Sequence, residues 1–378
     1  MTDINTNYQI CSKCIMDNND DPFIQFDSSG ICNHCNTYDN ILKKRLVFLN
    51  NGLKERDKLI QKIKKEGQGN KYDCVIGLSG GVDSTYVALL VKELGLRPLA
   101  IHLDNGWNSE LSVINIQNTL EKLKIDLYTH VINWKEFKDL QLSYLKASVI
   151  DIEALTDHAI IAVFYKVAKK YNIKNMIHGG NIETEGCLPS SWVHYKGDLM
   201  NIKAIHKRFG KKPITTFTTL HPLESLYLNK VKGIKNIDIL NYSPYNKKNI
   251  KNRIIDELNW RDYGGKHYES IFTRFYQSYI LPVKFNVDKR KSHLSTLICS
   301  GQISRQEALI EIKKPICDPH QLEDDKKYII KKFGLNKESF EGLMSLPIKK
   351  HTYYPSYINI INRLRPFAQF LKRIGLRS

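Results

Sequence analysis

Between residues 72 and 178 the hydrophobic pattern switches repeatedly from the short runs of strands to the spacing of helices. The apolar run 72–78 has the length and flanks of a buried parallel strand, and apolar residues recur at helical spacing over 85–94. Further strands are predicted at 98–103, 126–132 and 174–178, and further helices at 111–123 and 153–171. This alternation predicts an α/β fold with a doubly wound parallel sheet, which binds its ligands at the carboxyl ends of the strands.

The same pattern divides the chain into four predicted parts. The first part has two cysteine pairs and too few residues for a core of its own, so a metal would have to fold it. The second is charged and belongs to one long helix predicted over 38–65. The parts are a zinc ribbon at 1–40, a helical linker at 41–70, the α/β domain at 71–235 and a mainly helical region at 236–378, with a last helix near 360–374.

Four of the eight cysteines form two Cys-x-x-Cys pairs. Cys11 and Cys14 are followed, after seventeen residues, by Cys32 and Cys35, which is the spacing of a zinc ribbon. We therefore expect structural Zn²⁺ on these four thiolates. Disulfides and an iron–sulfur cluster are alternatives, although a cytosolic enzyme keeps its thiols reduced.

The formal net charge is +18. Such a charge suits an anionic substrate or nucleic acid, and it also arises when lysines are spread over solvated faces. The lysines are scattered along the chain and form no long basic tail, which makes a nucleic-acid partner the least favoured interpretation. No apolar stretch approaches a membrane span and no signal-peptide pattern is present, so a cytoplasmic protein without a membrane partner is expected.

The hexapeptide Ser-Gly-Gly-Val-Asp-Ser at 79–84 lies where the first strand gives way to a helix. Such a turn leaves unpaired N–H groups at a helix N-terminus, which is an anion site. The two glycines, Gly80 and Gly81, let the backbone approach a phosphate, and Ser79 and Ser84 add hydroxyls. Asp83 is suited to hold a cation that bridges phosphates. No Gly-Lys-Ser/Thr follows, so the loop is not a Walker A motif.

Two further loops are predicted at the same edge of the sheet. One begins with Asp104 after the strand 98–103, where a carboxylate could hold ribose or adenine. The other follows 174–178 and contains Gly180, Asn181 and Glu183. Each alone is an ordinary loop, but their order after strands of one sheet predicts a shared site.

Two clusters outside the sheet contain phosphate-binding residue types. Residues 260–270 include Lys266, and Arg274 follows; residues 288–293 include Lys289, Arg290 and His293. These side chains are candidates for contacts with phosphate or substrate. The alternative for both clusters is a solvated basic surface.

The sequence at 79–84 matches the SGGxDS motif of the PP-loop ATP pyrophosphatases, which cleave ATP between its α and β phosphates. The chain as a whole resembles the N-acetyl sugar amidotransferases of bacterial surface-polysaccharide synthesis, of WbpG and PseA type. The resemblance is carried by CSKCIMD at 11–17, IGLSGGVDS at 76–84, HGGN at 178–181, GGKHYES at 264–270 and DKRKSHLS at 288–295.

This resemblance implies an ATP-dependent, AMP-forming ligase that converts the acetamido group of an N-acetyl sugar into an acetamidino group for lipopolysaccharide, capsule or flagellar glycan. The sugar is expected to be nucleotide-linked. The acetamido oxygen would be adenylated with release of pyrophosphate, and ammonia would then replace AMP. The implied roles are phosphate binding by Ser79, Gly80, Gly81 and Ser84, Mg²⁺ positioning by Asp83, charge neutralisation by Lys266 and Arg274, nucleotide binding by Asp104, Gly180 and Asn181, and substrate binding by Glu183, Lys289, Arg290 and His293.

The source of ammonia is expected to lie outside the chain. It begins Met-Thr-Asp, without the N-terminal cysteine of one glutaminase type, and no cysteine lies in a Gly-x-Cys-x-Gly elbow. A separate glutaminase subunit is therefore expected, and the resemblance adds a cyclase-like partner of the imidazole-glycerol-phosphate-synthase type.

Two other functions compete with this interpretation. A tRNA-thiolating PP-loop enzyme would use the zinc ribbon and the charge, but it generally needs catalytic cysteines near the nucleotide. Only Cys74 and Cys187 lie in the sheet domain, and Cys187 is the candidate. A non-enzymatic zinc-ribbon adaptor is the second alternative, and the intact Asp83 and Ser84 argue against it.

Overall fold

The computed structural model describes residues 8–49, 51–265 and 268–363. Its centre is a five-stranded sheet in which every described pair of neighbouring strands is parallel. The order β3-β2-β1-β4-β5 places β1 between β2 and β4, which is the switch point of a doubly wound sheet. The predicted fold class is therefore confirmed. The strands are β1 (Cys74–Gly77), β2 (Pro98–Asp104), β3 (Asp126–Val131), β4 (Asn175–His178) and β5 (Lys235–Asp238).

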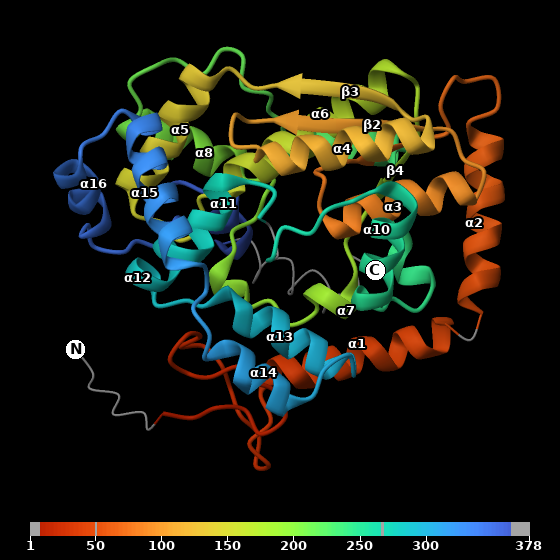
Figure 1. Cartoon of the computed structure of the whole chain (residues 1–378). Helices are drawn as coiled ribbons and strands as arrows, with labels where there is room; N and C mark the ends of the chain where they lie inside the picture. The colour runs from red at the N-terminus through yellow and green to blue at the C-terminus, as the bar shows by residue number, and fades with distance from the viewer. Residues whose placement is uncertain (1–7, 50, 266–267, 364–378) are drawn as a thin grey trace, which may run out of the picture.

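Helices supply most of the remaining described structure (Figure 1). A π-helical turn, Tyr276–Ile280, joins α11 and α12, and residues 357–363 are also helical. The α-helices are α1 (Asn33–Leu49), α2 (Gly52–Glu66), α3 (Val82–Glu93), α4 (Glu110–Leu123), α5 (Trp134–Ala147), α6 (Ala154–Lys170), α7 (Ile182–Glu185), α8 (Leu199–Phe209), α9 (Pro222–Lys230), α10 (Lys247–Leu258), α11 (Ile271–Phe275), α12 (Leu281–Phe285), α13 (Lys289–Cys299), α14 (Arg305–Ile312), α15 (Pro319–Phe333) and α16 (Lys337–Met344).

The two faces of the sheet are covered by different helices because successive strand residues point to opposite sides. In β1, Ile76 packs in the cluster formed with α3 and α10, whereas Val75 packs in the cluster formed with α6. Both residues are fully buried. A near-continuous apolar strand is the consequence of this double burial, and it is why β1 was recognisable in the sequence.

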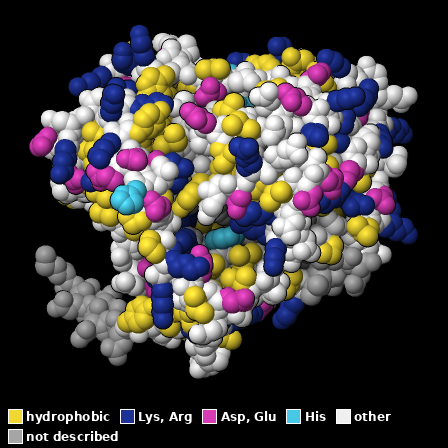
Figure 2. Space-filling view, in the orientation of Figure 1, with side chains coloured by type: hydrophobic (Ala, Val, Ile, Leu, Met, Phe, Trp, Pro, Cys, Tyr) yellow, Lys and Arg dark blue, Asp and Glu magenta, His cyan; other side chains and the backbone are white. Residues whose placement is uncertain are grey.

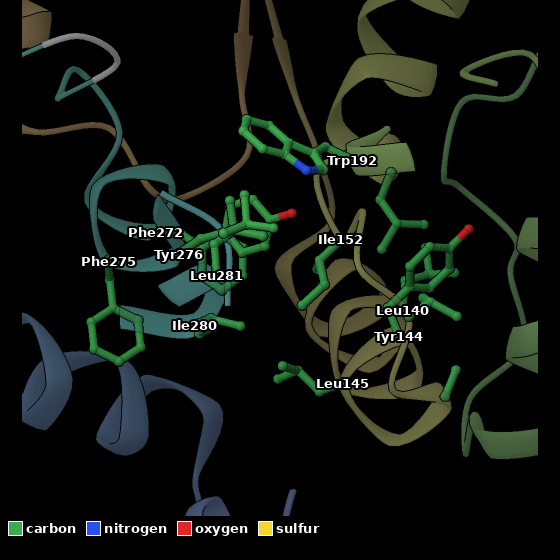
Figure 3. Close-up of a cluster of buried hydrophobic side chains, with 14 of the residues drawn as sticks. Leu140, Tyr144, Leu145, Ile152, Trp192, Phe272, Phe275, Tyr276, Ile280 and Leu281 are labelled. Carbon is green, nitrogen blue, oxygen red and sulfur yellow. The ribbon is translucent and has the colours of Figure 1, made fainter. Parts of the chain in front are cut away.

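A third apolar cluster joins the sheet domain to the helices that follow residue 270. Figure 3 shows Ile152, just before α6, between Leu140 and Tyr144 of α5 on one side and Phe272 and Tyr276 on the other. All five side chains are buried. This packing fixes the start of α6 against α11.

Several element boundaries differ from the prediction. The single helix predicted over 38–65 is two helices, α1 and α2, with the break beside Gly52, which lowers helix propensity. Helix α3 begins at Val82 rather than residue 85, because Gly81 in extended conformation is its N-cap. Strand β5 and helix α5 had no counterpart among the predicted elements. The helix predicted at 360–374 falls largely outside the described residues.

On the face shown in Figure 2, lysine and arginine side chains are interspersed with acidic ones. This distribution resembles the solvated surface expected for scattered lysines. None of the described helices is both long enough and apolar enough to cross a bilayer.

Candidate active site

The glycine turn between β1 and α3 is held from outside the sheet. Gly80 has φ +84°, a left-handed conformation that favours glycine. Its carbonyl accepts hydrogen bonds from Trp260 Nε1 at 2.7 Å and from the Tyr263 hydroxyl at 3.0 Å. Trp260 and Tyr263, from the predicted cluster at 260–270, therefore support the turn and are not part of a solvated basic surface.

The turn presents hydroxyls and backbone N–H groups to one side. Ser79 Oγ and Ser84 Oγ lie 3.2 Å apart, and Ser84 Oγ donates to the carbonyl of Gly81 at 3.1 Å. Among the described residues, no side chain makes a capping hydrogen bond at the N-terminus of the 12-residue helix α3. Its first-turn N–H groups and its dipole favour an anion, and the residues present fit a phosphate.

Asp83 lies in the first turn of α3, against the loop that follows β4. A Cβ added to Gly179 would lie 3.2 Å from Asp83 Cβ, so this glycine permits the close approach. The Asp83 carboxylate accepts a hydrogen bond from the Tyr245 hydroxyl. Burial and the Asp83 charge raise the pKa of Tyr245, so the hydroxyl keeps its proton for this bond. Asp83 is thus positioned beside the turn, as a carboxylate that holds Mg²⁺ would need to be.

A cavity of about 360 Å³ opens beside the turn. The ends of β1, β2 and β4, the first turns of α6 and the segment before α11 all contribute to its wall. The residues that line it are Gly77, Leu78, Ser79, Ser84, Ile101, His102, Leu103, Asn105, Asn108, Glu153, Thr156, Asp157, Ile160, Val163, Phe164, His178, Gly179, Glu269, Ser270 and Thr273.

The three predicted loops do meet at this cavity, through Ser79 and Ser84, Asn105 and Asn108, and Gly179. The individual residues singled out in the second and third loops have other positions. Asp104 Oδ1 accepts from the N–H of residue 106 at 2.8 Å and stabilises its own turn.

The predicted residues of the third loop also have local partners. Asn181 caps α7, accepting from the N–H of Thr184 at 2.9 Å. Gly180 packs near Asp238, and Glu183 accepts from the backbone N–H of Tyr245 at 2.9 Å. These three residues shape the loop but do not line the cavity.

Two of the predicted basic residues are engaged in ion pairs away from the cavity. Arg274 forms a bidentate pair with Asp325, with both N···O distances 2.7 Å. Arg290 pairs with Asp288 at 2.7 Å and donates to the carbonyls of residues 312 and 314. The structure therefore does not support the expectation that these guanidinium groups meet phosphate or sugar.

The other predicted basic residues differ among themselves. His293 contacts the Thr184 carbonyl and Lys247, not the cavity wall. Lys289 lies near Glu153 and Asp151, whose charges oppose the lowering of its pKa by burial. Lys266 lies outside the described residues.

Most of the polar wall of the cavity was not predicted from the sequence. Glu153 and Asp157 are one helical turn apart at the start of α6, and Thr273 and Glu269 come from the segment around α11. The carboxylates at i and i+4 on a predicted helix were the only available signal. Thr273 carried none, because its neighbour Glu153 is 120 residues away.

The four paired cysteines converge as predicted. Their Sγ atoms all lie within 4.8 Å of one another, and all four residues are fully buried. Cys11 and Cys35 are 3.9 Å apart, and Cys14 and Cys32 are 3.7 Å apart. A tetrahedral zinc with Zn–S of about 2.3 Å requires S···S of about 3.8 Å. Backbone N–H groups of Cys14 and Cys32 point to Cys11 Sγ, as befits a thiolate. The donor set fits a tetrahedral metal ion.

The predicted cluster at 288–295 contacts this cysteine segment. Lys291 Nζ lies 2.6 Å from Asp17 and 2.9 Å from Asp20. From α14, Arg305 donates to the carbonyls of Cys14 and Cys11 at 2.9 and 3.1 Å. In Figure 1, α13 and α14 lie beside α1 accordingly. The cluster links the first and last parts of the chain.

Cys187 is not positioned for thiolation chemistry. It is buried, lies outside the cavity wall, and binds Thr296 and Ser292 of α13 through its backbone. Contact with Cys299 and burial raise the pKa of Cys187, which disfavours a reactive thiolate. Cys74 is fully buried within β1, and burial raises its pKa as well.

Two protein families match separate parts of the chain. Residues 53–217 match the NAD synthase family, and residues 269–365 match the family described as LPS biosynthesis protein WbpG-like, C-terminal domain. Both matched segments contribute to the cavity, the second through Glu269, Ser270 and Thr273.

Individual relatives are distant. An uncharacterized protein of Methanocaldococcus jannaschii is 25% identical over 81% of this chain and 93% of its own length. One subunit of the glutamine-hydrolyzing GMP synthase of Methanococcus vannielii is 29% identical over 46% of this chain. The glutamine-hydrolyzing GMP synthase of Thermosipho africanus is also 29% identical, over 53% of it. The chain spans 52% and 39% of the lengths of these two synthase chains.

Two solved structures are also similar to this chain, with low sequence identities and low TM-scores. The NH3-dependent NAD synthetase of Campylobacter jejuni is 14% identical, with 80% of this chain and 98% of that chain covered and a TM-score of 0.30. The NMN synthetase of Francisella tularensis is 20% identical, with 48% and 71% covered and a TM-score of 0.29. The assignment rests instead on the two family matches together with the observed sheet. The chain therefore belongs to the WbpG-type PP-loop ATP pyrophosphatases, an ATP-dependent family of ligase and amidotransferase type.

Proposed function

We propose that the protein is an ATP-dependent amidotransferase that converts the acetamido group of an N-acetyl sugar into an acetamidino group for a surface polysaccharide. The observation that carries the proposal is the shared cavity. The phosphate-binding turn forms one side, and Glu269, Ser270 and Thr273, at the start of the WbpG-like segment, form another. ATP and an acceptor sugar bound by that second segment would meet in this cavity.

The chemistry requires activation because an amide carbonyl is a poor electrophile. The acetamido oxygen attacks the α-phosphorus of ATP, the bond from that phosphorus to the bridging oxygen breaks, and pyrophosphate leaves. Ammonia then forms a bond to the imidate carbon, and the carbon–oxygen bond breaks to release AMP. Each step needs both reactants held in one site.

The residues of the turn have defined tasks under this proposal. Ser79, Ser84 and the first-turn N–H groups of α3 would bind phosphate oxygens. Asp83, fixed by Tyr245, would hold Mg²⁺. When bound, Mg²⁺ would neutralise the charge that develops on the departing pyrophosphate.

The four-cysteine site would bind Zn²⁺ as a structural ion. Its four buried thiols would fill all four positions of a tetrahedral ion, which leaves no open coordination position for chemistry, and they lie outside the cavity wall. When bound, the ion would cross-link the two cysteine pairs.

Ammonia would come from a separate glutaminase subunit, and a cyclase-like subunit is a further candidate partner. Two supporting observations are the glutamine-hydrolyzing GMP synthases among the relatives and the absence of a Gly-x-Cys-x-Gly elbow in this sequence. A pure chain that used glutamine as readily as ammonium would contradict this part of the proposal.

The proposal is tested by incubating the protein with ATP, ammonium and a panel of nucleotide-linked N-acetyl sugars. We expect AMP and pyrophosphate in equal amounts, and one sugar whose mass falls by the small difference between C=O and C=NH. AMP formation with a tRNA substrate and a sulfur donor, and with no sugar, would favour the thiolation alternative.

A further inference from the structure

Five titratable side chains line the cavity within the described residues: His102, Glu153, Asp157, His178 and Glu269. The reaction proposed above leaves one proton without an acceptor. When neutral ammonia adds to the imidate carbon, the new nitrogen is a cation, and it must lose a proton before the carbon–oxygen bond to AMP breaks.

Each of the two histidines already has a hydrogen-bond partner. His102 Nδ1 lies 3.0 Å from the Leu78 carbonyl, which can only accept, so this nitrogen carries the proton. Its Nε2 lies 2.9 Å from Asn108 Nδ2 and accepts from that amide. His178 stacks on Phe164, and its Nε2 lies 2.9 Å from the Asn236 side-chain oxygen.

The carboxylates of Asp157 and Glu269 have other neighbours. Asp157 forms an ion pair with Lys196 at 2.9 Å. Glu269 lies against the phosphate-binding turn, since a Cβ on Gly81 would be 3.1 Å from its Oε1. That position suits the ATP side of the cavity.

Glu153 has a different environment. Its Oε2 accepts a hydrogen bond of 2.8 Å from Thr273 Oγ1, and its backbone carbonyl begins α6 by accepting from Asp157. Ile152, the residue before it, is locked between α5 and α11 (Figure 3). The side chain is thus held by two elements at the wall formed with the WbpG-like segment.

We propose that Glu153 is the general base that removes a proton from the ammonia nitrogen after it adds to the activated acceptor, an inference that rests on the proposed function. The nitrogen forms its bond to the carbon, and one N–H bond then breaks with the proton passing to a Glu153 carboxylate oxygen. The nitrogen lone pair re-forms a double bond to carbon, and the carbon–oxygen electron pair leaves with AMP.

The electrostatics match this task. Burial, with the nearby carboxylates of Asp157 and Asp151, raises the pKa of Glu153 to about 7, while Thr273 and Lys289 oppose the increase. A base whose pKa lies near the operating pH balances availability against proton affinity. Glu153 would be active when deprotonated, so the rate should rise with pH through this pKa.

The test compares two nucleophiles and two half-reactions in wild type and in Glu153→Gln. With ammonia, we expect the variant to lose about 100-fold or more in kcat, the usual contribution of a general base. Acceptor-dependent exchange of pyrophosphate into ATP, which reports adenylation alone, should be nearly unchanged. Hydroxylamine, whose adduct releases its proton more readily, should recover much of the loss.

Two neighbouring substitutions give matched pH profiles, measured at a constant concentration of neutral ammonia. Thr273→Val removes a bond that lowers the pKa of Glu153, so the rising limb should move to higher pH. Asp157→Asn removes a charge that raises this pKa, so the limb should move to lower pH. If Glu153 only supported the fold, these two variants would not be expected to shift the rising limb of the pH profile in opposite directions.

The inference is overturned if Glu153→Gln keeps the wild-type rate and rising limb with ammonia, or if it loses adenylation and amidination to the same extent. Failure of the proposed function looks different, because wild type itself would then form no AMP with any acetamido sugar.

Discussion

Substituting alanine for Gly80 tests whether the phosphate-binding turn depends on its unusual backbone. A non-glycine residue in the left-handed region costs about 1–2 kcal/mol. The added Cβ would also lie 2.9 Å from the Ser112 carbonyl oxygen and 2.9 Å from the Tyr263 hydroxyl, closer than such atoms approach. Relieving this overpacking costs about 1–3 kcal/mol more. We therefore expect Gly80→Ala to lower the free energy of unfolding by about 2–5 kcal/mol.

Gly301→Ala is the matched control. Gly301 has φ +72°, and a Cβ there would meet no atom of the described residues within 4 Å. It should show only the backbone cost of about 1–2 kcal/mol. The gain from restricting the unfolded chain is common to both variants and cancels. The difference between the two variants in the free energy of unfolding, measured by urea denaturation, therefore gives the cost of the clash, about 1–3 kcal/mol.

The clash should also affect ATP. Moving the carbonyl of Gly80 breaks its alignment with Trp260, so the KM for ATP in a pyrophosphate-release assay should rise in Gly80→Ala and stay unchanged in Gly301→Ala. Tyr263→Phe removes one of the two close atoms but also the hydrogen bond from that hydroxyl to the Gly80 carbonyl, so the cost of Tyr263→Phe is measured alone before the double variant is compared with Gly80→Ala. Equal destabilisation and equal KM values in the two alanine variants would refute the reasoning.

Two further predictions concern the metal and a buried ion pair. The purified protein should carry a single zinc ion per chain. Cys32→Ser should lose this zinc and melt at a lower temperature, whereas the control Cys74→Ser should keep it. Retention of zinc by Cys32→Ser would contradict the four-thiolate site. Asp325→Asn leaves the mostly buried Arg274 guanidinium without its charged partner. The free energy of unfolding, measured by urea denaturation, should fall by about 3–5 kcal/mol, far more than for an exposed ion pair. A decrease of less than about 1 kcal/mol would show that the pair is solvated.

Local sequence patterns were sufficient for the central strands. In β1 every residue from Cys74 to Ile76 is fully buried, which leaves an apolar run that is visible without any tertiary information. Strand β5 is Lys-Asn-Ile-Asp, with Ile237 alone apolar, because it is an edge strand with one neighbour. Its position depends on pairing with β4, and a short sequence window carries no such information.

In the candidate site, too, some residues could be predicted from local sequence and others could not. The turn at 79–84 was identifiable because its chemistry lies in consecutive residues. Residue type alone does not determine partners: the guanidinium of Arg274 pairs with Asp325, 51 residues further on. Glu153 was overlooked for the converse reason, since its surroundings come from segments distant in sequence.

The arrangement of the matched segments suggests how specificity is distributed along the chain. The NAD synthase-like segment contributes the phosphate-binding turn and the ends of β1, β2 and β4, the parts that any ATP pyrophosphatase of this fold needs. Glu269, Ser270 and Thr273 close the cavity from the WbpG-like segment, and Thr273 is bonded to Glu153. The described residues of the cysteine segment line no part of this cavity, yet they are tied to α13 and α14 through Lys291 and Arg305. A metal there would act on the acceptor side, by fixing the helices that follow α11, and would leave the chemistry of ATP to the sheet.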